Sequence, residues 1–240
     1  MGSYADDALF MSRNNIEYVE LISDDGKSKV MVIPAWQGRV MTTSAAGDEG
    51  DSYGWINYSF IKKRQIDLQF NPVGGEERFW LGPEGGVFSL YFRQGEKQIY
   101  KNWKVPPVLD IEAFKIQSQS KNCICLTKEG CLTNACGTTF YLNIKRTISL
   151  LDINEFAASF NLEFPKDIKA VAYKSDNQIT NIGNESWNKE TGLISVWMLS
   201  MFNPTSATTV FIPYKQSRKG KIVNAVSYTH LRAHETRGNL

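Results

Sequence analysis

The sequence predicts an all-β protein, built as one large antiparallel β-sandwich. Apolar runs with the period of two that is typical of strands recur along the chain, and turn residues separate them. Beyond the first fifteen residues, no stretch of ten or more shows the 3.6-residue period of a helix. Hydrophobic residues make up 42% of the 240 residues, which is enough for a sizeable core.

The elements follow in order along the chain. Residues 4–14 start with two acidic residues and suit one short helix. Shorter strands come next, separated by turns that contain glycine or proline. Longer strands follow in the second half. We expect strands at residues 16–21, 30–33, 39–43, 138–151, 155–164, 168–181, 193–201 and 208–214.

The sequence predicts a single domain at residues 4–225, because no flexible linker or internal repeat divides the chain. Residues 226–240 read VSYTHLRAHETRGNL and contain both histidines, His230 and His234. This string resembles a translated sequencing adapter, and we expect the natural segment to be truncated near Ala225. An ordinary polar tail is the alternative. For this reason the two histidines, although spaced i, i+4, are not taken as a metal site.

Charge and hydropathy exclude several classes of protein. The net charge of +2 without a basic cluster argues against nucleic-acid binding. No apolar run approaches the about 20 residues of a membrane helix, and the first residues lack a signal peptide. Localisation stays open: cytoplasmic by default, or periplasmic if the natural N-terminus is missing. No motif for a cofactor is present.

The four cysteines fall within fourteen residues, in NCICLTKEGCLTNAC. The C-x-C spacing departs from the tight knuckles of zinc sites. We expect a strand with a hairpin turn at residues 128–130, and cysteines that act as small apolar residues. A disulfide or a metal stays open as an alternative. The four are Cys123, Cys125, Cys131 and Cys136.

Residues 74–86, GGEERFWLGPEGG, are the strongest candidate for a binding site. Strand-like apolar residues flank a turn with five glycines, so charged groups and an indole are expected at a surface. Carboxylates and a guanidinium suit sugar hydroxyls, and tryptophan suits the C–H face of a sugar ring. The alternative is a solvated hairpin with an internal Arg–Glu pair and a core tryptophan. The candidates are Glu76, Glu77, Arg78, Trp80 and Glu84.

Two further residues are candidates for the same site. Arg39 follows Gly38 at the start of an apolar strand, where it is either a ligand-facing donor or an exposed edge residue. Trp187 lies in the polar loop NESWNKET. A tryptophan in such a loop marks either a binding surface or a hydrophobic plug under the loop.

Several of these segments carry a family resemblance. VIPAWQGRVMTTSAAGDEGDSYGWINY, FNPVGGEERFWLGPEGGVFSLYF, WKVPPVLDIEAF and ETGLISVWMLSMFNP resemble an uncharacterised bacterial family (DUF6786-like) common among Bacteroidetes. That family is similar in turn to galactose mutarotase-like proteins, through a Gly-Arg near an early strand and a pattern in which Gly74, Arg78, Trp80 and Glu84 take part.

The resemblance implies a β-supersandwich with a carbohydrate cleft, and a sugar or oligosaccharide as partner. Aldose 1-epimerases use a histidine acid and a glutamate base from late in the chain. Here no histidine precedes residue 226, so only the binding residues are carried over and the catalytic pair stays unknown. The expected function is carbohydrate binding with a sugar epimerase-like activity. The alternative is a non-catalytic carbohydrate-binding or structural module.

Overall fold

The computed structural model describes residues 2–165 and 167–211, and its first compact unit runs to Asn203. The second unit begins at Pro204, and its described residues contain a turn at Thr205–Thr208 but no strand. The strand expected at residues 208–214 is therefore absent as far as residue 211. Its remainder lies outside the described residues, as do residues 226–240 with His230 and His234.

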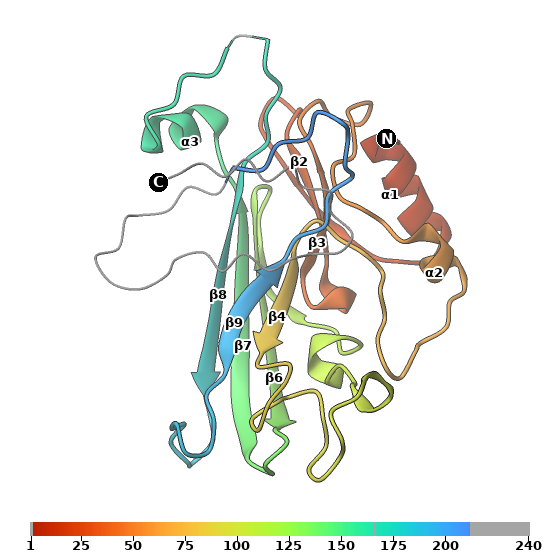
Figure 1. Ribbon diagram of the computed structural model, residues 1–240. Helices are drawn as coiled ribbons and strands as arrows, with labels where there is room; N and C mark the ends of the chain where they lie inside the picture. Colours follow the sequence, from red (N-terminus) through yellow and green to blue (C-terminus); the bar gives the residue numbers. More distant parts are fainter. Residues whose placement is uncertain (1, 166, 212–240) are drawn as a thin grey trace. The chain divides into compact units, whose positions relative to one another are not determined.

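The described residues form nine strands in three antiparallel sheets, which confirms the all-β prediction (Figure 1). The first sheet has the order β1-β2-β3, the second pairs β4 with β9, and the third has the order β5-β6-β7-β8. The strands are β1 (Val19–Ile22), β2 (Lys29–Ile33), β3 (Arg39–Ser44), β4 (Arg78–Gly82), β5 (Lys115–Gln119), β6 (Cys123–Thr133), β7 (Thr139–Leu150), β8 (Tyr173–Asn181) and β9 (Ser195–Leu199).

The helices are short. They are α1 (Tyr4–Arg13), α2 (Tyr58–Lys62) and α3 (Ile153–Ser159), with 3-10 turns η1 (Pro34–Trp36), η2 (Tyr100–Asn102) and η3 (Pro107–Leu109). A capping box between Ser3 and Asp6 fixes the start of α1, as the acidic first turn predicts. Among the described residues, no helix is long and apolar enough to cross a bilayer.

The core has two parts, on the two sides of β2 and β3. The first part lies between these strands and the long third sheet, where alternate residues of β7 face inward. The second part lies under α1 and α2 and includes Met31, Ile33 and Met41. An antiparallel bridge between Val40 and Glu77 joins β3 to the segment that leads into β4. The first two sheets are thereby linked side by side.

Three local predictions were wrong. Residues 155–164 do not form a strand, because α3 covers the first half of this segment. Asp152 caps α3 by accepting from the amides of Asn154 and Glu155. Residues 128–130 do not form a turn, because β6 continues through them in register with β7. The glycine-rich segment 74–86 is not an open turn, since its centre is strand β4, and its flanks 66–70 and 87–92 are not strands.

Gly54 supports a test of this packing. A Cβ atom there would lie 2.1 Å from the carbonyl oxygen of Met41 and 2.9 Å from the Cα of Thr42, so Gly54→Ala must displace backbone. We expect a loss of about 1–3 kcal/mol in the free energy of unfolding, measured by urea denaturation. Gly85→Ala is the matched control, because its Cβ would meet only Gln98 Oε1 at 3.8 Å. Equal midpoints for the two variants would contradict this packing.

Candidate functional site

Three arginines from three strands are buried in this fold. Arg39 of β3, Arg78 of β4 and Arg146 of β7 are each no more than 1% exposed. Sequence reasoning identified the first two and missed Arg146. The missed signal was present: Leu142, Ile144, Arg146 and Ile148 alternate along β7, which places the arginine on the inward face.

Arg146 forms an ion pair between the two layers of the fold. Its Nη2 donates to Glu77 Oε1 at 2.8 Å, and Ser175 Oγ donates to Glu77 Oε2 at 2.8 Å. The guanidinium also lies over the ring of Phe79, 5.2 Å from its centroid. Burial lowers the pKa of Arg146, and the charge of Glu77 opposes this shift. Glu77 is therefore engaged in holding the layers together.

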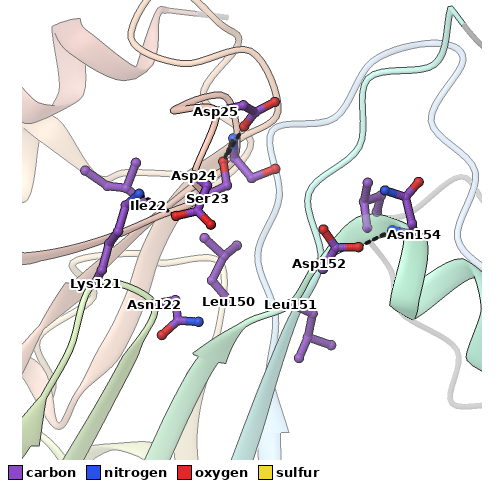
Figure 2. A pocket seen from close by; sticks show the side chains of 12 residues that line it. Ile22, Ser23, Asp24, Asp25, Lys121, Asn122, Leu150, Leu151, Asp152 and Asn154 are labelled. Atoms are coloured by element: carbon purple, nitrogen blue, oxygen red, sulfur yellow. Dashed lines mark hydrogen bonds and ion pairs between the residues drawn. The ribbon is translucent and has the colours of Figure 1, made fainter.

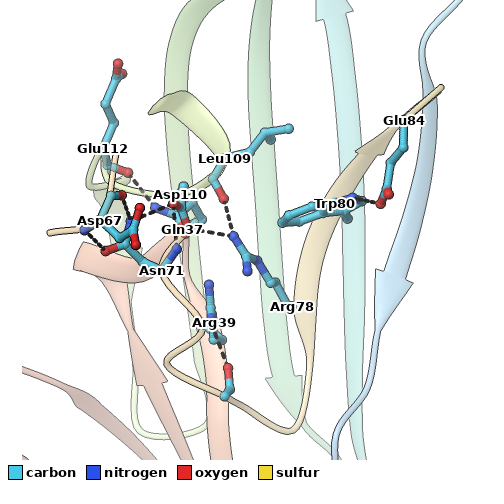
Figure 3. A network of polar contacts seen from close by, with 11 residues as sticks. Gln37, Arg39, Asp67, Asn71, Arg78, Trp80, Glu84, Leu109, Asp110 and Glu112 are labelled. Carbon is cyan, nitrogen blue, oxygen red and sulfur yellow. Dashed lines mark hydrogen bonds and ion pairs between the residues drawn. The ribbon is translucent and has the colours of Figure 1, made fainter. Parts of the chain in front are cut away.

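Arg78 forms a second buried ion pair on the other side of β4. Its Nη2 donates to Asp110 Oδ1 at 2.8 Å and to the Leu109 carbonyl at 3.0 Å. Asp110 Oδ2 accepts from the backbone and side-chain amides of Asn71, at 3.0 and 2.7 Å (Figure 3). Burial lowers the pKa of Arg78 to about 10, and Asp110 opposes this shift. Both oxygens of Asp110 are therefore occupied.

Arg39 differs from the other two because it has no ion-pair partner among the described residues. Its Nη1 donates to the Gly74 carbonyl at 2.7 Å, and its Nε has no partner there. The bridge between Val40 and Glu77 places Arg39 beside Arg78 on adjacent segments, and Figure 3 shows both side chains directed toward Asp110 and Asn71. Burial, together with the charge of Arg78, lowers the pKa of Arg39 well below its ordinary value.

Gly74 and Gly75 accommodate the side chain of Arg39: Gly74 accepts its hydrogen bond, and Gly75 leaves room for its stem. Gly75 has φ +115°, and a Cβ there would lie 2.5 Å from Cδ of Arg39. Its lack of a side chain lets the Arg39 stem lie against the backbone. The glycines that suggested a ligand-binding turn therefore accommodate a buried side chain of the protein itself.

Trp80 is 3% exposed and packs in the first core. Tyr91 stacks on its indole at a centroid distance of 5.5 Å, and the Arg78 guanidinium lies over it at 4.0 Å. Its Nε1 donates to Glu84 Oε1 at 2.6 Å. The indole thus has no open face for a sugar, which agrees with the alternative of a core tryptophan.

Glu76 is buried among hydroxyl groups. Its carboxylate accepts from Thr43 Oγ1 at 2.9 and 3.1 Å. Burial raises the pKa of Glu76 to about 7, and these hydrogen bonds oppose the shift. The side chain faces the interior and not a cleft.

Trp187 lies apart from the arginines, in the loop between β8 and β9. Its ring packs edge-to-face on Phe140 at 5.6 Å. It lines a pocket of about 650 Å³ with Tyr141 and Asn184. The sequence-predicted residues therefore do not form one site: Arg39 and Arg78 come together, Glu84 is held by Trp80, and Trp187 belongs to a different pocket.

A pocket of about 390 Å³ adjoins the Arg39–Arg78 network. It shares Asn71 and Asp110 with the network, and its other walls come from the ends of α1 and α2 and from η1. Sequence reasoning missed it because its walls come from five separate segments. The apolar lining is Ile16, Ala35, Trp36, Phe60, Ile61, Ile66, Val73 and Ile111, and the polar lining is Asn14, Asn15, Arg64, Gln65, Asn71 and Asp110.

Unusual backbone conformations gather around this pocket, which we call the Trp36 pocket. Asn15 (φ 58°) and Arg64 (φ 51°) line it, and Gln37 (φ 60°) follows Trp36 directly. Only one other described non-glycine residue, Asn161, has positive φ. Such conformations carry a cost and concentrate at functional sites. The Trp36 pocket is therefore the best candidate site of the described residues.

A different pocket, of about 530 Å³, lies where the β1–β2 turn meets the start of α3 (Figure 2). Its acidic residues serve local structure. Asp24 pairs with Lys121 at 2.7 Å, Asp25 accepts from Ser23 Oγ at 2.7 Å, and Asp152 caps α3. Its lining contains no aromatic residue. It offers fewer free groups to a ligand than the Trp36 pocket.

The described residues contain no group of three or more histidine, cysteine or acidic side chains placed to hold a metal ion. All four cysteines are free thiols. Cys123 and Cys125 share a face of β6, opposite Ser149 and Thr147 of β7. Cys125 is buried, whereas Cys131 and Cys136 are exposed.

The difference between the two neighbouring arginines is testable. Arg78→Met leaves Asp110 buried without its cation, so we expect a loss of about 3–5 kcal/mol in the free energy of unfolding. Arg39→Met removes one hydrogen bond but also relieves the burial of a charge without an ion-pair partner, so we expect a loss of at most about 1 kcal/mol. Urea denaturation of both variants measures the contrast. An equal loss in the two would contradict the assigned pairing.

Glu76 predicts a pH dependence of stability. Its folded pKa of about 7 lies above its ordinary value of 4.5, so the folded state binds the proton more tightly. The stabilisation is complete below the ordinary pKa and is lost as pH rises through about 7. Relative to Glu76→Gln, the wild type should lose about 2 kcal/mol between about pH 5 and about pH 8. Parallel curves for the two proteins, measured by urea denaturation, would contradict the prediction.

Comparison with known proteins identifies a family but not an activity. The chain matches the family of unknown function DUF6786 over residues 2–236. No curated protein and no solved structure matches it. The match includes most of residues 226–240, whose adapter origin stays a prediction. Because the match covers nearly the whole sequence, this chain belongs to the DUF6786 family.

Proposed function

We propose that this protein binds a carbohydrate in the Trp36 pocket. The observation that carries the proposal is the combination of an aromatic wall with side-chain amides and a guanidinium in one concave site. Sugars present C–H faces that pack on aromatic rings, and hydroxyls that pair with amides and charged groups. Such a pocket, apolar with a few convergent polar groups, has the general character of a small-molecule site.

The polar groups of the pocket come from structure that is already held in place. Asn71 and Asp110 are fixed by their mutual hydrogen bonds and by Arg78. Arg64 is held by donating to the Arg13 carbonyl at 3.1 Å. Groups that are fixed before the ligand arrives lose little entropy on binding, which favours recognition. The buried arginines then act as support for the pocket.

A mutarotase-like activity is the finer form of the proposal, and it rests on the resemblance of residues 74–84 to galactose mutarotase-like proteins. Ring opening needs one group to accept the anomeric proton and another to protonate the ring oxygen. The carboxylate that lines the pocket, Asp110, already accepts three hydrogen bonds. Binding without catalysis is therefore the form that the lining residues favour.

Ligand-observed NMR tests the binding site. Saturation-transfer spectra with D-glucose, D-galactose and cellobiose should show binding to the wild type. Trp36→Ala should weaken it about tenfold or more, because an aromatic wall is lost. Thermal unfolding of the variant checks that it is folded.

Trp187→Ala is the matched comparison, since Trp187 lines the other aromatic pocket. Loss of binding in Trp187→Ala, with Trp36→Ala unchanged, would place the site elsewhere and overturn the assignment. If none of the three sugars binds, the proposal that this protein binds a carbohydrate is overturned. Anomer exchange of a bound aldose, followed by NMR, separates an epimerase from a binding protein: a rate equal to that of the buffer argues against catalysis.

A further inference from the structure

The Trp36 pocket lies above an excess of positive charge. Arg39 and Arg78 are both buried beside it, and Asp110 is the one carboxylate that pairs with either of them among the described residues. Arg64, on the rim, donates to a carbonyl and has no ion-pair partner in this part of the chain. Of the three, only Arg64 lines the pocket, whereas Arg78 reaches it through its pair with Asp110 and Arg39 lies beside Arg78.

The other carboxylates of this region are engaged elsewhere. Glu84 accepts from Trp80 Nε1, and Glu112 pairs with Lys128 at 2.6 Å. Asp67 is exposed and accepts from the amide of Gln69 within its own loop, at 2.7 Å. None of these three lines the pocket. Asp110 is therefore the one carboxylate of the described residues that lines the pocket, and it is already paired with Arg78.

A buried guanidinium without a counter-charge is unfavourable, because the protein interior screens its field weakly. An anion that enters the pocket would reduce this cost and would pair directly with Arg64, the one arginine of the lining. Planar carboxylates match the fork of guanidinium donors particularly well.

We propose that the sugar bound in the Trp36 pocket carries a carboxylate, as a uronic acid does. This inference rests on the proposed function and names its substrate class. The apolar wall with Trp36 would contact the ring face, the amides of Asn15 and Gln65 would meet hydroxyls, and the carboxylate would lie toward Arg64 and the buried arginines. The field of Arg39 acts on the ligand through the Asp110–Asn71 floor of the pocket.

The test compares D-glucuronate with D-glucose at equal ionic strength, by saturation-transfer NMR and calorimetry. These sugars differ at one carbon, so the ratio of their dissociation constants isolates the carboxylate. We expect glucuronate to bind about tenfold more tightly at low salt, with a ratio that falls as salt screens the charges. D-Glucose 6-phosphate is the third probe. Tighter binding of this phosphate than of glucuronate would overturn the proposal that the ligand's anionic group is a carboxylate.

Two variants locate the effect. Arg39→Met and Arg64→Gln should each lower the glucuronate-to-glucose preference toward one. Lys121→Gln, at the separate pocket of Figure 2, is the matched control and should keep the preference. If Arg39→Met does not fold, Arg64→Gln decides the question, because Arg64 is exposed. A preference that both variants retain would overturn the role of these arginines.

The outcomes separate this inference from the proposed function. Equal binding of glucose and glucuronate at the Trp36 pocket would overturn the proposal that the sugar carries a carboxylate. The proposal that the pocket binds a carbohydrate would stand. Binding of none of the three probes would count against both.

Discussion

Two adjacent residues at the start of β4, Glu77 just before the strand and Arg78 as its first residue, hold this protein together. Glu77 pairs with Arg146 of β7, toward the long sheet, and Arg78 pairs with Asp110, toward the segment that covers the opposite side. Neighbouring side chains in a strand point to opposite faces, so one dipeptide can bind both layers. Each pair is buried, and each costs desolvation that its short hydrogen bonds must offset. The position and register of β4 depend on both.

Arg39 is the one buried arginine of the three that has no acidic partner among the described residues. A pair of buried ion pairs would be electrically balanced, but a third arginine placed beside Arg78 leaves positive charge next to a pocket. Glu77 and Asp110 each have a buried arginine as ion-pair partner, whereas Arg39 has no acidic partner among the described residues. The Trp36 pocket, whose lining includes the positive-φ residues Asn15 and Arg64, shares Asp110 with this network. The proposal that the bound sugar carries a carboxylate follows from this asymmetry.

Much of the fold could be read from local pattern. The alternation along β7 and the acidic first turn of α1 located these elements within a residue or so. The errors occurred where local signals conflict with context. Residues 155–164 alternate as a strand does, yet the cap at Asp152 starts a helix there. In 74–86, the glycines suggested a turn, although they make room for Arg39.

The sequence by itself determined the β class, the family and the unusual character of residues 74–86, because periodicity, composition and motif are local properties. Only the tertiary structure decided what that segment does. Burial of Trp80 and the partners of Arg78 depend on residues distant in the chain, such as Trp197 for Trp80 and Asp110 for Arg78. The Trp36 pocket is assembled from five separated segments, so no local pattern could reveal it.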